Sequence, residues 1–142
     1  MNKARVVLDS NVLLSGLKSD LGNSYKVLQA LGSGLFEIAL SVPLVLEYES
    51  ILKKYLDRAI YSDQRIEEIL DSICSIGIET KVFFLWRPIL SDGFDDHILE
   101  VAVAGQCDSI VTFNKRHFVP ERKFGIKILE PKEFIDQIRR SV

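Results

Sequence analysis

Short apolar runs alternate along the chain with longer stretches in which apolar residues recur every three or four positions. A run of four to eight apolar residues that is bounded by polar or turn residues is typical of a buried strand. Five such runs predict strands, at residues 4–9, 35–41, 78–85, 108–113 and 126–129. The strands therefore contribute no more than short buried segments, and helices must supply most of the rest of the core.

The helical stretches lie between these runs. Ser41 offers an N-cap and Pro43 falls in the first turn that follows, where a missing N–H costs nothing. Strands that alternate with helices predict a parallel sheet with helices on both faces. We expect an α/β fold, a three-layer α/β/α sandwich with about five parallel strands. The helices are predicted at residues 23–33, 43–55, 63–76 and 95–105 and from Pro131 onward.

Composition places the chain among ordinary globular proteins. Its 142 residues correspond to a single domain over residues 1–142, with 47% hydrophobic and 27% charged residues. The net charge of −2 means that any nucleic-acid contact must come from a local basic patch. Cys74 and Cys107 form no CxxC motif and favour a reducing compartment. No apolar stretch approaches the ~20 residues of a membrane span, so we expect a cytoplasmic protein with no membrane partner.

Polar residues directly follow the first strand and lie on the helix after the second, near the strand ends where ligands bind in parallel sheets. The first strand runs into Asp9, Ser10 and Asn11, and then into another apolar run. Asp9 could simply cap a helix, but its place between two apolar runs favours burial, which is costly for a charge. After the second strand, Glu49 has Lys53 four residues later, whereas Glu47 has no such partner. Asp9 and Glu47 are therefore the better candidates for a functional site.

The densest acidic cluster is the segment SDGFDDHILE at residues 91–100. Asp92, Asp95 and Asp96 precede or open a helix, and Glu100 lies one turn after Asp96 on the same helix face. One or two of these carboxylates could cap the helix and complement its dipole. Four of them repel one another, and a divalent cation would relieve that repulsion.

Turn and basic residues follow the fourth strand. Thr112 and Asn114 are ordinary turn residues, and Lys115 and Arg116 could contact phosphate or form a solvated loop. The chain contains no GxxxxGK[ST], GxGxxG or GxSxG motif, and its two His and two Cys have no zinc-ligand spacing. Carboxylate oxygens suit Mg²⁺ or Mn²⁺, so these ions are the predicted cofactors.

Three segments together resemble the PIN-domain family, and in particular the ribonuclease toxins of type II toxin–antitoxin pairs. They read VVLDSNVLLSGL, SVPLVLEYESIL and DGFDDHILEVAVAGQCDSIVTFNKRHF, and together they cover 51 of the 142 residues. The resemblance implies an α/β/α sandwich and a Mg²⁺- or Mn²⁺-dependent endoribonuclease with three or four acidic residues in its pocket. It also implies an RNA substrate and a cognate antitoxin, and it allows a homodimer.

Carried over position by position, the resemblance makes Asp9, Glu47 and Asp96 the catalytic acids and metal ligands. Asp95 adjoins Asp96 and is the alternative at that position. The family often has an acidic residue directly after the fourth strand, where this chain has Asn114, so the ligand set around a second ion is reduced. Supporting roles fall to Ser10, Asn11, Glu100 and Thr112, and the candidate phosphate contacts are Arg87, Lys115 and Arg116.

Two other functions compete with this one. A PIN-like module that binds RNA or protein without cleaving it is favoured by the neutral Asn114. A phospho-accepting receiver domain also has a parallel sheet with an acidic pocket, but it needs an Asp after a central strand. Here the third strand runs instead into Leu85, Trp86 and Arg87.

Overall fold

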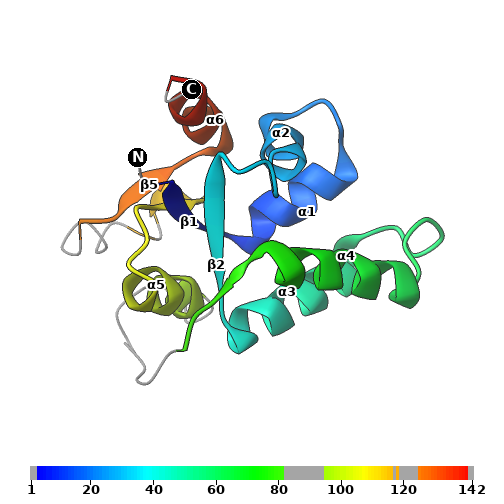
Figure 1. The fold of residues 1–142 in the computed structure, drawn as a ribbon. Coiled ribbons are helices and arrows are strands. Elements are labelled where there is room, and N and C mark those ends of the chain that lie inside the picture. Colours follow the sequence, from blue (N-terminus) through cyan, green and yellow to red (C-terminus); the bar gives the residue numbers. More distant parts are fainter. Residues whose placement is uncertain (1–2, 82–94, 117, 119–124, 141–142) are drawn as a thin grey trace.

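The computed structural model describes residues 3–81, 95–116, 118 and 125–140. Within them a five-stranded sheet runs in the order β3-β2-β1-β4-β5, and every neighbouring pair is parallel (Figure 1). Its central strand pairs on both sides, since Val6 lies opposite Ile38 on β2 and Ser109 on β4. The predicted parallel sheet is confirmed. The strands are β1 (Ala4–Leu8), β2 (Phe36–Leu40), β3 (Ile78–Glu79), β4 (Ser109–Val111) and β5 (Lys127–Leu129).

Helices cover both faces of the sheet, as the three-layer prediction requires (Figure 1). Phe36 meets Phe134 of α6 edge-to-face at 4.9 Å, so α6 lies on the face to which Phe36 points. The other face carries the end of α5, where Arg5 donates to the Gly105 carbonyl at 2.9 Å. No helix in the described residues is long and apolar enough to cross a membrane. The helices are α1 (Ser10–Lys18), α2 (Asn23–Gln29), α3 (Val42–Tyr55), α4 (Asp63–Ile76), α5 (Asp95–Ala104) and α6 (Pro131–Arg140).

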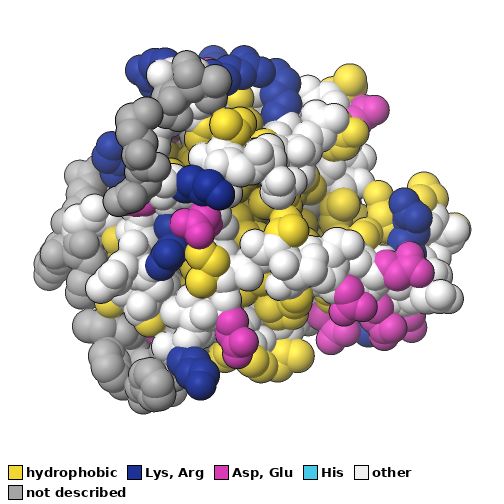
Figure 2. Space-filling model, in the orientation of Figure 1, with side chains coloured by type: hydrophobic (Ala, Val, Ile, Leu, Met, Phe, Trp, Pro, Cys, Tyr) yellow, Lys and Arg dark blue, Asp and Glu magenta, His cyan; other side chains and the backbone are white. Residues whose placement is uncertain are grey.

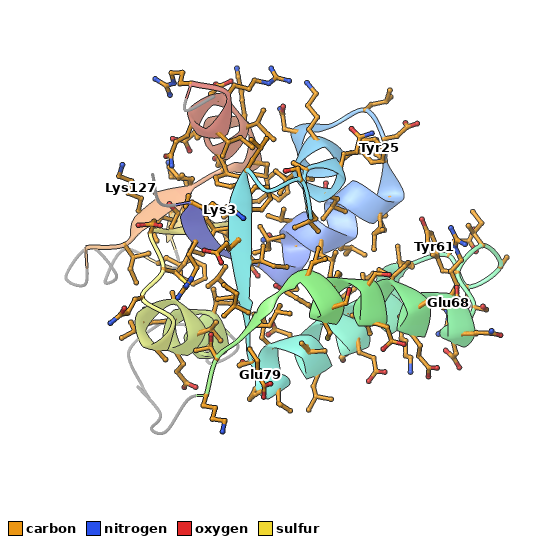
Figure 3. The ribbon with its side chains drawn as sticks, viewed as in Figure 1. Lys3, Tyr25, Tyr61, Glu68, Glu79 and Lys127 are labelled. Carbon is orange, nitrogen blue, oxygen red and sulfur yellow. The ribbon has the colours of Figure 1, made fainter. Side chains whose placement is uncertain are left out.

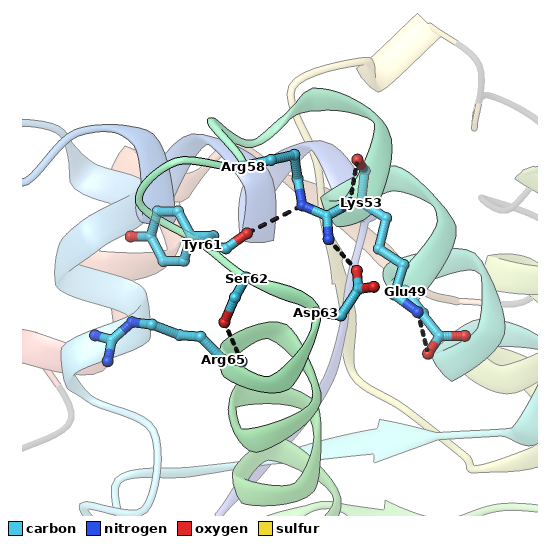
Figure 4. Close-up of polar contacts among 7 residues, drawn as sticks. All are labelled: Glu49, Lys53, Arg58, Tyr61, Ser62, Asp63 and Arg65. Atoms are coloured by element: carbon cyan, nitrogen blue, oxygen red, sulfur yellow. Dashed lines mark hydrogen bonds and ion pairs between the residues drawn. The ribbon is translucent and has the colours of Figure 1, made fainter.

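Side-chain caps begin α3, as the sequence predicted, and also α4. The Ser41 hydroxyl accepts from the Leu44 amide at 3.2 Å, and the Ser62 hydroxyl accepts from the Arg65 amide at 3.2 Å. In the turn between the two helices, Arg58 donates to the Tyr61 carbonyl at 3.0 Å and pairs with Asp63 (Figure 4). These contacts fix the angle at which α4 leaves α3.

Helix α1 is the element that the sequence pattern missed. Gly16 lies within it, and glycine disfavours helix interiors by about 1 kcal/mol relative to alanine. The glycine is required by packing, because a Cβ there would lie 3.0 Å from the Ser24 carbonyl and closer still to the Leu28 side chain. The close approach of α1 and α2 therefore overrides the local preference.

All five strands are shorter than predicted, and the difference is largest in β3 and β4. In β4, Thr112 and Phe113 lie beyond the last strand residue, although the Thr112 amide still donates to the Leu129 carbonyl at 2.9 Å. In β3, Thr80 and Lys81 already lie outside the strand, and residues 82–85 are outside the described part. The Thr112 side chain lies just beyond the end of β4, and its hydroxyl donates to the Asp9 carboxylate.

The order of the strands defines where a ligand would bind. From β1, the chain moves outward through β2 to β3, then returns to the other side of β1 for β4 and β5. The connections thus diverge between β1 and β4. In open parallel sheets this divergence creates a crevice outside the carboxyl ends of the two strands. The residues to examine are therefore those that follow Leu8 and Val111.

Candidate functional site

Asp9 occupies the crevice between β1 and β4. Its amide donates to the Val111 carbonyl at 2.9 Å, which extends the β1–β4 pairing by one bond, and its side chain is only 4% exposed. Asp9 is by position the N-cap of α1, yet its side chain makes no capping hydrogen bond. The Ser10 and Asn11 amides still lower the pKa of Asp9, so the start of α1 contributes to holding this carboxylate without forming a regular side-chain cap.

The Asp9 carboxylate is held by hydroxyl groups. Thr112, fully buried, donates to Oδ2 at 2.7 Å, and Ser10 donates to Oδ1 at 3.4 Å. The Thr112 hydroxyl oxygen in turn accepts the Asn114 amide at 3.0 Å. On the same side the Asn11 side-chain oxygen accepts the Phe113 amide at 3.5 Å. The loops after β1 and β4 are thus joined through Asp9 and its polar neighbours.

Burial dominates the electrostatics of this carboxylate. It raises the pKa of Asp9 above its ordinary value, and the hydrogen bonds from Thr112, Ser10 and nearby amides of α1 lower the pKa by less. Among the described residues, no Lys, Arg or His forms an ion pair with Asp9. A buried carboxylate that meets neutral donors alone is destabilising unless a cation joins it.

Tyr48 lies beside Asp9 and was missed by the sequence reasoning. It is 2% exposed, and its hydroxyl donates to the carbonyl of Leu8, the residue before Asp9. Burial raises the pKa of Tyr48 well above its ordinary value, and the charges of Asp9 and Glu47 raise it further. The signal was available, because a tyrosine in the apolar stripe of a helix needs a partner for its hydroxyl.

Glu47 precedes Tyr48 in the second turn of α3 and is half-buried. Its charge and that of Asp9 both act on the Tyr48 hydroxyl. Glu100 is 2% exposed in the middle of α5. Helix α5 starts near the carboxyl edge of the sheet, because its other end, at Gly105, contacts Arg5 at the beginning of β1.

Other predicted site residues are exposed or lie outside the described part. Asn114, Lys115 and Arg116 are exposed, and Lys115 pairs with Glu133 of α6 at 2.9 Å. That pair and the Glu130 amide hold the pKa of Glu133 below its ordinary value, with the amide as the larger cause. Arg87 and the side chains of Asp95 and Asp96 are outside the described residues. Among the side chains that are described, no three acidic, His or Cys groups form a metal-binding cluster.

A five-stranded parallel sheet between helices, with a buried carboxylate where the strand order diverges, defines a class of α/β proteins that bind ligands at one sheet edge. Within that class, residues 5–116 match the family model described as PIN domain. The chain belongs to the PIN-domain family. The match begins in β1 and ends after β4, so it includes both loops around Asp9.

Solved structures share the fold at low sequence identity. VapBC2 from Rickettsia felis, bound to a DNA fragment from their promoter, has a TM-score of 0.60 at 16% identity and matches 89% of this chain and 98% of that one. FitAB bound to an IR36 DNA fragment has a TM-score of 0.62 at 15% identity, with 89% and 94% covered. DNA-bound VapBC from Salmonella typhimurium has a TM-score of 0.60 at 17% identity, with 90% and 98% covered. None of the curated protein sequences matches this chain.

Proposed function

We propose that this chain is a divalent-metal-dependent endoribonuclease and the toxin of a type II toxin–antitoxin pair. The observation that carries the proposal is the buried Asp9 carboxylate, held by Thr112 at the divergence of β1 and β4 in a PIN domain. Burying a carboxylate costs free energy, and a cation that joins it offsets that cost. Asp9 is buried, and it forms no ion pair with any Lys, Arg or His of the described residues.

The donor chemistry around Asp9 fits Mg²⁺ or Mn²⁺. Both ions prefer hard oxygen ligands, and the candidate ligands, Asp9 and Glu47, are carboxylates rather than thiols or imidazoles. Asp9, Glu47 and Asp96 would hold the ion, with Asp95 as the alternative to Asp96. When bound, a divalent ion polarises the phosphate and lowers the pKa of water at the site.

The residues of the chain would share the remaining work. Thr112 fixes the orientation of the Asp9 carboxylate through its 2.7 Å hydrogen bond. Glu47 would orient the attacking water and accept its proton. Asn114 offers an oxygen without a charge, so a second ion would bind more weakly than the first. Ser10, Asn11 and Glu100 would support the loop and helix on which these groups stand.

The substrate would be single-stranded or looped RNA, whose sugar–phosphate backbone can enter a crevice. Lys115 and Arg116, exposed after β4, and Arg87 are the candidate phosphate contacts. Acidic side chains gather along α4 in Figure 2, so that face would repel RNA. Lys3 and Lys127, labelled in Figure 3, stand at the amino ends of β1 and β5, away from Asp9.

The proposed partner is a cognate antitoxin, and the proposed location is the cytoplasm. The structures described as VapBC2, FitAB and VapBC were determined with DNA. This chain has a net charge of −2, so in a comparable assembly the DNA contacts would fall to the partner. A homodimer would be compatible with the same assembly.

Calorimetric titration with Mn²⁺, followed by RNA cleavage on the same samples, tests the proposal. The wild type should bind Mn²⁺ and cleave RNA, and Asp9→Asn and Asp96→Asn should lose both. Asp71→Asn, which removes an exposed carboxylate of α4, is the matched control and should behave as the wild type. Absence of Mn²⁺ binding by the wild type would overturn the metallonuclease.

The alternative is a PIN-like module that binds RNA without cleaving it, favoured by the neutral and exposed Asn114. Mn²⁺ binding without cleavage of any RNA, with Asn114→Asp restoring cleavage, would support this alternative. The receiver alternative loses its basis, because residues 5–116 match the PIN-domain family model. The predicted third strand is β3 at the edge of the sheet, whereas Asp9 follows the central strand β1.

A further inference from the structure

The peptide unit that joins Leu8 to Asp9 is held at both of its polar ends. Its N–H, from Asp9, donates to the Val111 carbonyl of β4 at 2.9 Å. Its carbonyl, from Leu8, accepts the Tyr48 hydroxyl of α3. The orientation of this peptide plane sets the direction in which the Asp9 side chain leaves the backbone. Two different elements therefore fix that direction, one on each side of β1.

The bond to Val111 belongs to the pairing of β1 with β4, whereas the bond from Tyr48 comes from a helix. Tyr48 is 2% exposed, so its hydroxyl reaches the Leu8 carbonyl across the core rather than through solvent. Forty residues separate the two partners along the chain. Because Glu47 directly precedes Tyr48, the same contact also sets where the Glu47 backbone lies relative to Asp9.

We propose that Tyr48 is a positioning residue that ties α3 to the end of β1 and so holds Asp9 and Glu47 in register for one shared ion. This inference rests on the proposed function. Groups that orient metal ligands from behind typically change metal affinity or activity by about 10–100-fold when they are removed. Tyr48→Phe removes the hydroxyl and keeps the ring that fills the core.

Tyr61 provides a matched control. Its hydroxyl also donates to a backbone carbonyl of another element, that of Leu17 at the end of α1, at 3.0 Å. Tyr61 is half-buried and lies in the turn between α3 and α4, as labelled in Figures 3 and 4. Tyr61→Phe therefore removes the same kind of hydrogen bond without touching β1 or the loop after it.

The first experiment compares Mn²⁺ affinity and cleavage kinetics of the wild type, Tyr48→Phe and Tyr61→Phe. Tyr48→Phe should weaken Mn²⁺ binding by roughly 10-fold and lower kcat by a similar factor, with KM within about twofold. Tyr61→Phe should leave all three values within about twofold of the wild type. Equal losses in the two variants, or no loss in Tyr48→Phe, would overturn the positioning role.

The second experiment needs neither metal nor RNA. Hydrogen exchange at the Asp9 amide, measured by NMR at 10 °C, should be faster in Tyr48→Phe relative to the Val7 amide and unchanged in Tyr61→Phe. If the wild type fails to bind Mn²⁺ or to cleave RNA, the proposed function fails, while this measurement still decides whether Tyr48 positions Asp9. Unchanged exchange at Asp9 in Tyr48→Phe would refute the inference by itself.

Discussion

Replacing Asp9 by Asn should stabilise the metal-free protein, although it should abolish activity. The substitution removes a buried charge and keeps the shape of the side chain. The amide oxygen of Asn can still accept from Thr112, at the position where Asp9 Oδ2 accepts at 2.7 Å. The amide nitrogen can donate to the Ser10 hydroxyl oxygen, which lies 3.4 Å from Asp9 Oδ1. Both hydroxyl contacts can be kept, and the contacts from the Ser10 and Asn11 amides are smaller causes of the pKa shift than burial, so we expect the desolvation of the charge to decide the sign.

The size of the effect follows from typical values. Single stabilising substitutions commonly give about 0.5–2 kcal/mol, and we expect about 1 kcal/mol here. At about 2.1 cal/mol/K per residue, unfolding 142 residues has an entropy of about 0.3 kcal/mol/K. Asp9→Asn should therefore raise Tm by about 3 °C in EDTA at pH 7.5.

The pH dependence has a definite sign. Burial raises the pKa of Asp9 in the folded protein above the value of 3.8 for an exposed carboxyl. The stability linked to the protonated carboxyl is therefore complete below about pH 3.8 and is lost as the pH rises through the folded-state pKa. The gain from Asp9→Asn should be absent in acid and grow toward neutral pH.

Thermal unfolding with and without Mn²⁺ provides the assay. A ligand at 100 times its Kd stabilises by about 2.7 kcal/mol, which corresponds to about 8–9 °C here. Mn²⁺ should raise the Tm of the wild type by that amount and leave the Tm of Asp9→Asn unchanged. Asp9→Asn should therefore have the higher Tm in EDTA, and the wild type should have the higher Tm in Mn²⁺. Asp71→Asn, at an exposed position of α4, should follow the wild type within about 0.5 kcal/mol. The reasoning is refuted if Asp9→Asn is the less stable protein in EDTA, or if Mn²⁺ raises both Tm values equally.

Other substitutions test the polar groups around the site. Thr112→Val removes the donor to Asp9 and the acceptor of the Asn114 amide, and urea unfolding should show a loss of about 1–3 kcal/mol that Thr112→Ser largely restores. Asn114→Asp should tighten Mn²⁺ binding several-fold in calorimetry, and unchanged affinity would exclude Asn114 from the ligand set. Lys115→Ala should weaken RNA binding and reduce the salt slope by about 1, with a stability change below about 1 kcal/mol because its pair with Glu133 is exposed. Glu133→Gln should release Lys115 and tighten RNA binding, and filter binding across a salt series measures both effects.

Local signals were sufficient for most of the elements. Helix α4 begins and ends where predicted, because Ser62 caps it and Gly77 follows it. Helix α1 escaped prediction because the reason for Gly16 is its contact with α2, which no local pattern contains. The order of the strands in the sheet could not be predicted for a similar reason. Periodicity shows which side chains are buried but not which strands pair, and β3 lies at an edge although it is third in the chain.

Some residues of the candidate site could be predicted from the sequence, and others could not. Asp9 stands out in the sequence because a carboxylate between two apolar runs is expensive to bury. Its partner Thr112 lies 103 residues away and looks like an ordinary turn residue until the strands are placed side by side. Tyr48 was counted among the apolar positions of its helix, so the hydroxyl that reaches Leu8 went unnoticed. Residue type and local pattern predict the candidate metal ligand, whereas the residues that orient its side chain can be identified only once the fold is known.

Under the proposed function, stability and activity make opposite demands on Asp9. A protein under selection for the fold alone could place Asn at position 9, with hydrogen bonds to the same two hydroxyls and no buried charge. The carboxylate is instead kept 4% exposed, against two hydroxyls that can stabilise its charge only in part. Thr112 and Tyr48 then hold in place a group that the fold alone disfavours. That combination is expected of a preorganised ligand for a cation, and it explains why a single substitution should move stability and activity in opposite directions.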